Sequence, residues 1–403
     1  MLNSNHGKKF FGFSKNVTVA GFVSFFMDVS SEMIYPLVPL FLANTLGVSK
    51  SAIGLIEGIA ESTASLLKVF SGWMSDRIGN RKWLMAAGYG ISTLSRPFVA
   101  LAMGWQQVLG SRFIDRFGKG VRTAPRDALI AESADNAYLG RAFGFHRAMD
   151  TMGAVAGPAL AFFFLGIFSN EYRTVFWLSM MPGIIAVILI IFFITEKKKL
   201  PATHAKRPRL TLAHFDWRFK FFVLIAALFA AGNSSDVFLI LRAEQKGVQT
   251  AMIPVVYLLF NLVYSVSSIP AGVAADKFGR KRVILMGFIL FAILYYGFAV
   301  AASATAIWIL FGLYGLFMGL TEGIQKAFLT TIIPSDFKAT AFGVYNTVVG
   351  LAMFPASLIG GWLWDHVSPS ATFNFGALTA SLSAVLFIVF IVVMRRSDAT
   401  RAL

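Results

Sequence analysis

The chain has 403 residues, of which 57% are apolar and only 14% charged, and its formal net charge is +16. A soluble chain normally has about a quarter of its residues charged, so the composition indicates a membrane protein. Cysteine is absent, which excludes disulfide bonds and cysteine metal sites, and the five histidines lack the paired spacing of a zinc site. The positive charge does not predict a nucleic-acid partner, because the basic residues gather in short gaps between apolar segments.

Apolar segments of membrane-spanning length recur along the whole chain. A spanning helix needs about 20 mostly apolar residues, and such segments lie near 17–43, 51–73, 83–102, 106–128, 141–168, 174–195, 218–242, 250–274, 283–302, 304–332, 341–364 and 372–394. They predict an all-α membrane protein with twelve transmembrane helices in two pseudo-symmetric six-helix bundles. The expected domains are an N-terminal bundle over 1–195, a basic cytoplasmic linker over 196–216 and a C-terminal bundle over 217–403.

The basic residues predict how these helices are oriented. Lys and Arg gather in alternate gaps, notably 76–82, 196–216, 277–282 and 395–401, whereas the other gaps hold few, namely Lys50, Arg173 and Lys246. Short cytoplasmic loops carry the excess of Lys and Arg in membrane proteins. Both termini are therefore predicted to be cytoplasmic, in a multi-pass protein of the cytoplasmic (inner) membrane.

A charged hairpin sequence occurs twice, two hundred residues apart. Residues 72–82 read GWMSDRIGNRK and residues 272–282 read GVAADKFGRKR, and each copy joins the end of one apolar segment to the start of the next. The tripeptide Ala-Phe-Gly at 142–144 likewise recurs at 341–343. Internal repeats are typical of transporters that bind their substrate near the bilayer midplane, between the repeats.

With these hairpins the chain resembles, over its whole length, the major facilitator superfamily of transporters, whose loop motif is Gly-x-x-x-Asp-Arg-x-Gly-x-Arg-Lys. The resemblance implies a secondary active transporter that works by alternating access. It also implies gating roles for the hairpin residues: Asp76 against the helix that begins near Thr340, Arg77 paired with Asp127, and Asp276 in the second copy.

A second motif lies in segment 141–168. Proton-coupled antiporters of the superfamily carry the pattern Gly-x8-Gly-x3-Gly-Pro-x2-Gly-Gly, and the chain matches its first part with Gly144, Gly153, Gly157 and Pro158. Ala and Phe at 161–162 replace the last two glycines. The match favours export against a proton gradient, although glycines at this spacing also simply allow helices to pack closely.

Carboxylates within the predicted spans are the candidates for proton coupling. A charge in the bilayer interior is costly, and Asp28 and Glu32 lie four residues apart on one helical face. Two carboxylates so close tend to share a proton, which suits coupling; the alternative is a structural pair with a neighbouring arginine. Glu61 and Asp150 are the other coupling candidates, whereas Glu57 is expected near the outer mouth, where water can solvate it.

Segment 106–128 carries cations on one helical side, at Arg112, Arg116, Lys119, Arg122 and Arg126. The deeper Arg112 and Arg116 are candidates to bind the substrate, because guanidinium groups match carboxylate and phosphate. Arg122 and Arg126 are expected at the cytoplasmic mouth, paired with Asp127, Glu132 or the hairpin.

Further polar residues are predicted to pair within the spans or to line the substrate path. Arg96 can pair with either Asp115 or Asp28, and the sequence does not choose between them. His146 and Asp150 share a helical face, and Glu322 and Lys326 are spaced for a local ion pair. The substrate-binding candidates besides Arg96, Arg112 and Arg116 are Tyr35, Asp236, Asn261 and Asn346.

The sequence leaves two transport functions open. The first is proton-coupled export of an amphiphilic or anionic small molecule, such as a drug, siderophore or metabolite; the alternative is a proton-coupled uptake symporter or exchanger for an organic anion. No activated nucleophile or phosphate-binding loop occurs, so neither an enzyme nor an ATP-driven pump is expected. We expect a monomer whose partners are a small-molecule substrate, protons and membrane lipids, with no cofactor, metal or nucleic acid.

Overall fold

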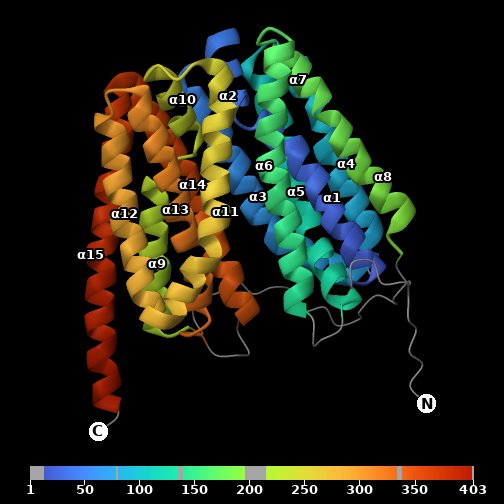
Figure 1. Ribbon diagram of the computed structural model, residues 1–403. Helices are drawn as coiled ribbons and strands as arrows, with labels where there is room; N and C mark the ends of the chain where they lie inside the picture. The colour runs from blue at the N-terminus through green and yellow to red at the C-terminus, as the bar shows by residue number, and fades with distance from the viewer. Residues whose placement is uncertain (1–12, 79, 135–138, 196–214, 334–337, 402–403) are drawn as a thin grey trace, which may run out of the picture. The chain divides into compact units, whose positions relative to one another are not determined.

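The structure is a computed structural model that describes residues 13–78, 80–134, 139–195, 215–333 and 338–401. Almost all of these residues are helical, and no β-strand occurs within the described ranges (Figure 1). The N-terminal part forms α1 (Lys15–Ile34), α2 (Val38–Leu40), η1 (Phe41–Thr45), α3 (Lys50–Ile78), α4 (Arg81–Ala100), α5 (Trp105–Ser133), α6 (Leu139–Ile167), α7 (Tyr172–Leu178) and α8 (Met180–Phe193). The C-terminal part forms α9 (Trp217–Gly232), α10 (Val237–Gln245), η3 (Thr250–Met252), α11 (Ile253–Phe278), α12 (Arg280–Val300), α13 (Ala304–Leu329), α14 (Lys338–His366) and α15 (Pro369–Arg401).

The predicted apolar segments coincide with these helices. Each segment corresponds to one helix or to consecutive helical pieces, such as α7 and α8. The helical content and the apolar helices confirm the prediction of an all-α membrane protein. Within the described residues, nine helical stretches are long and apolar enough to cross a membrane. The stretches outside that group are α3, α4 and α5, which carry more charged and polar residues. The number of twelve spans and the side on which the termini lie stay predictions.

Contacts between residues divide the chain into two compact units. Unit 1 comprises Met1–Val38 and Leu66–Arg207, and unit 2 comprises Pro39–Ser65 and Pro208–Leu403. Residues 39–65 are grouped with the C-terminal part because the first half of α3 packs against α14, where the hydroxyl of Ser62 donates to the carbonyl of Gly350. The predicted division into an N-terminal bundle, a linker and a C-terminal bundle is not tested by this grouping and stays a prediction.

Each unit has its own apolar core. In unit 1, Val23 and Met27 of α1 pack with Met85 and Tyr89 of α4 and with apolar residues of α8. In unit 2 the core is aromatic: Phe229 of α9 stacks on Phe288 of α12 with ring centroids 4.6 Å apart, and it meets Phe291 of α12 edge to face with centroids 4.8 Å apart. Lipid is as apolar as these side chains, so close packing rather than exclusion from water stabilises such cores.

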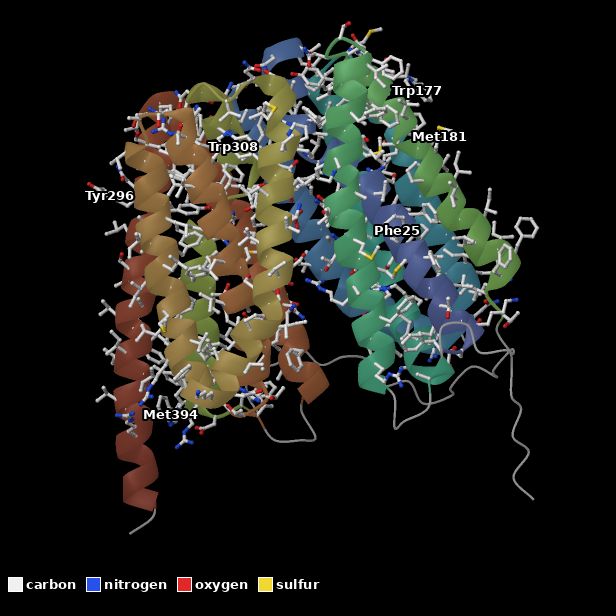
Figure 2. The ribbon with its side chains drawn as sticks, in the orientation of Figure 1. Phe25, Trp177, Met181, Tyr296, Trp308 and Met394 are labelled. Atoms are coloured by element: carbon white, nitrogen blue, oxygen red, sulfur yellow. The ribbon has the colours of Figure 1, made fainter. Side chains whose placement is uncertain are left out.

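The outer surface of the helices is apolar, while charged side chains are buried. Trp177 is 44% exposed, Met181 61% and Tyr296 59%, and all three project away from the helices that carry them (Figure 2). Arg96 and Asp115, by contrast, are almost completely buried. This distribution is the reverse of that in a soluble protein and is the one expected of a chain surrounded by lipid.

Both charged hairpins join one helix to the next, as the sequence predicts. The first joins α3 to α4, where the side chain of Asn80 accepts the backbone N–H of Trp83. The second joins α11 to α12 through Gly279, whose φ of +93° favours glycine. Arg81 donates to the carbonyl of Ala128 at 3.2 Å, and Arg280 donates to that of Ala327 at 3.0 Å, each across 47 residues. The two hairpins are therefore anchored by equivalent contacts.

Candidate functional site

The glycines of the α6 motif hold α6 directly against α1. A Cβ atom on Gly153 would lie 2.6 Å from the carbonyl oxygen of Phe25 and 2.8 Å from Cβ of Asp28, and one on Gly157 would lie 2.7 Å from Cβ of Glu32. Only hydrogen atoms fit at these two positions. The packing role that the spacing predicts is confirmed for Gly153 and Gly157, and it occurs at the two carboxylate positions of α1.

Three of the predicted coupling residues gather where α1 meets α6. Asp28 is half-buried and lies within electrostatic range of Glu32 on its own helix and of Asp150 on α6. Lys119 and Arg122 of α5 also lie within that range. Unit 1 thus contains a carboxylate cluster, Asp28, Glu32 and Asp150, with cations beside it.

Arg96 pairs with Asp115, which resolves the choice that the sequence left open. Arg96 is 1% exposed, and its Nη2 lies 3.2 Å from Oδ1 of Asp115. Its guanidinium also donates to the hydroxyls of Ser30 at 3.3 Å and Ser31 at 3.0 Å. Arg96 therefore joins α4 to α5 and α1.

The two deeper cations of α5 are buried beside the same carboxylate. Arg112 and Arg116 are 4% and 7% exposed, and Nη1 of Arg112 lies 4.0 Å from Oδ2 of Asp115. The guanidinium of Arg112 also lies over the ring of Tyr35, 5.6 Å from its centroid. Four arginines, namely Arg96, Arg112, Arg116 and Arg122, lie within electrostatic range of this single Asp115.

Arg122 is buried against α4, and its expected position at the cytoplasmic mouth stays a prediction. It is 5% exposed, and its guanidinium lies 4.3 Å from the ring centroid of Tyr89. The reason is the close approach of α4 and α5, since a Cβ on Gly88 would lie 2.7 Å from that of Arg122. Arg126 pairs with Asp127 at 2.9 Å, as predicted; Glu132 pairs with Arg81 of the first hairpin.

A buried polar network lies one helical turn from the carboxylate cluster. Oγ of Ser24 on α1 is 2.7 Å from Nε2 of His146 on α6. Nε2 of His146 lies 3.9 Å from Oδ1 of Asp150, and Arg126 donates to Oγ of Ser24 at 3.4 Å. The sequence singled out His146 and Asp150 but missed Ser24, because a lone serine in an apolar helix gives no functional signal.

Unit 2 contains a second acidic group, around the break between α9 and α10. Asp236 lies at the start of α10 and accepts a hydrogen bond from the hydroxyl of Tyr314 at 2.8 Å. Glu57 and Glu61 of α3 lie within electrostatic range of Asp236. Glu61 therefore belongs to this acidic group, in a different unit from Asp28.

Glu57 is buried, and the expectation that water solvates it is wrong. It is 1% exposed, because the first half of α3 lies against α14. A Cβ on Gly58 would be 3.0 Å from the carbonyl oxygen of Phe354, and Gly54 is in contact with Ser357. The small residues on either side of Glu57 thus bring a second helix over it.

The remaining predicted residues have separate places. Asn261 is buried on α11, and Asn346 is half-buried on α14. Glu322 pairs with Lys326 at 3.6 Å, as predicted. Asp276 lies 3.5 Å from Arg280 within its own hairpin.

The gating contacts expected of the first hairpin stay predictions. Residues 76 and 77 lie on α3, but their side chains fall outside the part that the structure describes. The described partner of Asp127 is Arg126, so neither the pairing of Arg77 with Asp127 nor the position of Asp76 is tested.

A shallow apolar groove between α11 and α13 lies apart from all of these charges. Leu259, Val263 and Trp308 are among its lining residues. Its lining carries no charged group that could pair with a charged substrate.

A helical chain with an apolar surface and buried ion pairs has the features of an integral, multi-pass membrane protein. The model of the Major Facilitator Superfamily matches residues 20–259 and 221–402, and the chain belongs to this superfamily of transporters.

Relatives and solved structures support this assignment. The chain is 37% identical over 381 residues to an uncharacterized MFS-type transporter of Methanocaldococcus jannaschii, covering 93% of this chain and 94% of that relative. It is 24% identical over 368 residues to a protein of Lactococcus lactis named a multi-drug resistance efflux pump PmrA homolog, covering 88% and 89%. The solved structure of a POT family transporter in complex with 5-aminolevulinic acid has the same fold, with a TM-score of 0.80 at 12% identity over 96% of this chain and 97% of that one.

Proposed function

We propose that the protein moves an organic anion across the cytoplasmic (inner) membrane together with protons. The observation that carries the proposal is the cluster of four arginines that lie within electrostatic range of Asp115. Guanidinium groups match the geometry of carboxylate and phosphate oxygens, so such a cluster can bind an anionic substrate. Arg112 and Arg116 are the residues proposed to bind it, with Tyr35 supporting the Arg112 guanidinium.

The carboxylate cluster supports coupling of this anion to protons. Asp28 lies within electrostatic range of Arg122, which is also one of the four arginines around Asp115, so an ionised Asp28 weakens the positive potential that attracts an anion. Protonation of Asp28 removes a negative charge from the site and favours the anion. By thermodynamic linkage, the bound anion favours protonation to the same degree, and proton and anion therefore bind together.

Binding of proton and anion to the same state gives symport, and a proton gradient directed inward then drives uptake. The second candidate is proton-coupled export of a drug-like or anionic compound. It is favoured by the match of Gly144, Gly153, Gly157 and Pro158 to the antiporter motif and by the relative named as an efflux pump homolog.

A binding screen tests the anion proposal. The purified full-length protein is unfolded thermally at pH 6 and pH 8 with a monocarboxylate (benzoate), a dicarboxylate (succinate), a phosphate ester (glucose 6-phosphate) and an organic cation (tetraphenylphosphonium). At least one anion is expected to stabilise the protein, and more strongly at pH 6. Stabilisation by the cation alone would show that the α5 arginines are structural.

Proton movement in proteoliposomes then separates the two directions of coupling. With the pH dye pyranine inside the vesicles, external addition of a stabilising anion is expected to acidify the lumen if proton and anion move together. Alkalinisation would instead support exchange of the compound for protons, as export requires. Protein-free liposomes control for permeation of the uncharged acid through the bilayer.

A further inference from the structure

We propose that Arg122 of α5 is a further anion-binding residue of unit 1. It binds a carboxylate or phosphate oxygen through Nη1, while Tyr89 of α4 covers one face of its guanidinium. The proposal rests on the anion transport proposed above. It gives a ligand to an arginine that the sequence places at the cytoplasmic mouth.

The guanidinium of Arg122 is buried, but the protein leaves its hydrogen-bonding capacity unused. Arg122 is 5% exposed, and its Nη1 is buried without a hydrogen-bond partner. Within the part of the chain that the structure describes, Arg122 forms no hydrogen bond or ion pair. A buried donor without an acceptor costs free energy. The oxygen of a bound anion would supply the acceptor that this nitrogen lacks.

Two carboxylates lie near enough to reduce the cost of burying this charge. Asp28 and Asp115 are within electrostatic range of Arg122. Asp115 lies 3.2 Å from Nη2 of Arg96, and neither acid forms an ion pair with Arg122 among the described residues. The site therefore tolerates a buried guanidinium and still leaves Nη1 open to an acceptor from a ligand.

Close packing of α4 against α5 fixes where the Arg122 side chain begins. A Cβ atom on Gly88 would lie 2.7 Å from Cβ of Arg122 and 2.8 Å from the carbonyl oxygen of Gly118. The next residue, Tyr89, is 1% exposed, and its ring centroid lies 4.3 Å from the guanidinium carbon of Arg122. A cation held over a buried aromatic ring is stabilised by the electrons of the ring. The guanidinium is thus held in place before any ligand binds, which lowers the entropy cost of binding.

The contact with Tyr89 leaves the hydrogen-bond donors of Arg122 available. The N–H groups of a guanidinium lie in its plane, and carboxylate or phosphate oxygens bind at that edge. The ring of Tyr89 lies against the face instead, so an aromatic contact and a bound anion are compatible. Arg112, already proposed to bind the anion, has similar support from Tyr35, at 5.6 Å. The same pairing of arginine with tyrosine thus occurs twice along α5.

The affinity of the full-length protein for anions tests this role. Succinate, benzoate and glucose 6-phosphate are each titrated at pH 6 into the purified parent and into Arg122→Gln, which loses the charge and the planar edge of donors. Any of these anions that binds the parent is expected to bind Arg122→Gln at least about tenfold more weakly. A weakened carboxylate and a weakened phosphate ester each identify the group that Arg122 binds.

Matched variants separate ligand binding from a structural role. Arg126→Gln removes the same charge from the same helix, but Arg126 is paired with Asp127, so this control is expected to reduce the affinity far less. Tyr89→Phe keeps the ring and should keep the parental affinity. Tyr89→Leu removes the ring and should weaken binding by about threefold or more. A purely structural role would lower the melting temperature of unliganded Arg122→Gln without changing its affinity.

The outcomes also distinguish this role from the anion proposal itself. Parental affinity in Arg122→Gln would overturn the role of Arg122, and weakened binding in Arg112→Ala in the same titration would show that the anion proposal stands. If Arg122→Gln fails to fold, Arg122→Lys keeps the charge without the planar edge; it is expected to bind more weakly than the parent, and parental affinity would overturn the role. Absence of anion binding by the parent would overturn both proposals.

Discussion

Arg96 and Arg112 both lie beside the carboxylate of Asp115, but they differ in their distance from it and in their other contacts. Arg96 lies 3.2 Å from Asp115 and also donates to two serines of α1, whereas Arg112 lies 4.0 Å from Asp115 and stacks over Tyr35. At the level of single residues, the first arginine joins three helices, and the second is the one proposed to bind the anion.

Removal of Arg96 is therefore expected to destabilise the protein. In Arg96→Ala, Asp115 loses its nearest counter-charge, and breaking a buried ion pair by removing one partner costs about 3–5 kcal/mol. Thermal unfolding in detergent should show a large drop in melting temperature. A drop no larger than that of Arg112→Ala would contradict the framework role.

Removal of Arg112 is expected to weaken anion binding instead. A hydrogen bond to a charged group contributes about 1.5–3 kcal/mol, which corresponds to a loss of affinity of at least about tenfold. Titration of the protein with the anion identified in the thermal screen measures this affinity. Arg112→Lys should recover part of the affinity lost in Arg112→Ala. Unchanged affinity in Arg112→Ala would place the anion elsewhere.

At the level of elements, two glycines hold α6 in contact with α1. This contact fixes which part of α6 lies opposite the carboxylates of α1. Gly144 on the same helix has no atom within 4 Å of its Cβ position. The motif therefore contains two glycines that the packing requires and one that it does not.

This difference predicts unequal effects of glycine substitution. Gly157→Val forces α6 away from Glu32 and is expected to cost about 1–3 kcal/mol, the usual penalty for overpacking. In Gly144→Ala the added methyl group meets no neighbouring atom. The substitution is expected to be neutral or slightly stabilising, since it removes glycine from a helix interior. Thermal unfolding measures the stability of both variants. Equal effects of the two substitutions would show that the contact between α6 and α1 does not explain the glycines of the motif.

The start of α3 is held by a residue of α14. The carboxylate of Asp365 accepts the backbone N–H groups of Lys50 and Ser51, at 3.2 and 2.7 Å, and the Ser51 hydroxyl at 2.7 Å. A carboxylate at this position accepts hydrogen bonds from backbone N–H groups of the first turn, which have no acceptor within the helix. Its negative charge also interacts favourably with the positive end of the helix dipole.

Asp365→Ala is expected to fray this turn at a cost of about 0.5–2 kcal/mol, as for loss of a helix cap. Hydrogen–deuterium exchange of a peptide covering 48–55 should accelerate, while peptides from α12 should not change. Asp276→Ala, which removes an exposed carboxylate with one local ion pair, is the control. Unchanged exchange at 48–55 would show that Asp365 does not cap α3.

At the level of the whole molecule, the absence of cysteine allows a direct test of the predicted topology. Gln249 and Lys277 are both exposed and lie at opposite ends of the helical stretch 250–278. In intact cells, a membrane-impermeant maleimide is expected to label Gln249→Cys but not Lys277→Cys, and to label both after permeabilisation. The opposite pattern would place the termini outside.

Hydropathy and charge were sufficient to predict where the helices lie, because a spanning helix must satisfy length and composition by itself. The contacts of each charge depend on helix rotation and on distant segments, which the sequence does not display. Arg96 could not be assigned to Asp115 rather than Asp28 without the orientation of three helices. The burial of Glu57 depends on residues of α14 about three hundred positions later.

The contacts of α3 with α14 also have a consequence for biosynthesis. Ser62 bonds to Gly350 across 288 residues, and Ser51 to Asp365 across 314. At about 5–20 residues per second, the ribosome needs on the order of 15–60 s to produce the second partner after the first. During that interval α3, with Glu57 and Glu61, lacks the helix that later covers it. These acids are therefore covered by α14 only after most of the chain has been synthesised.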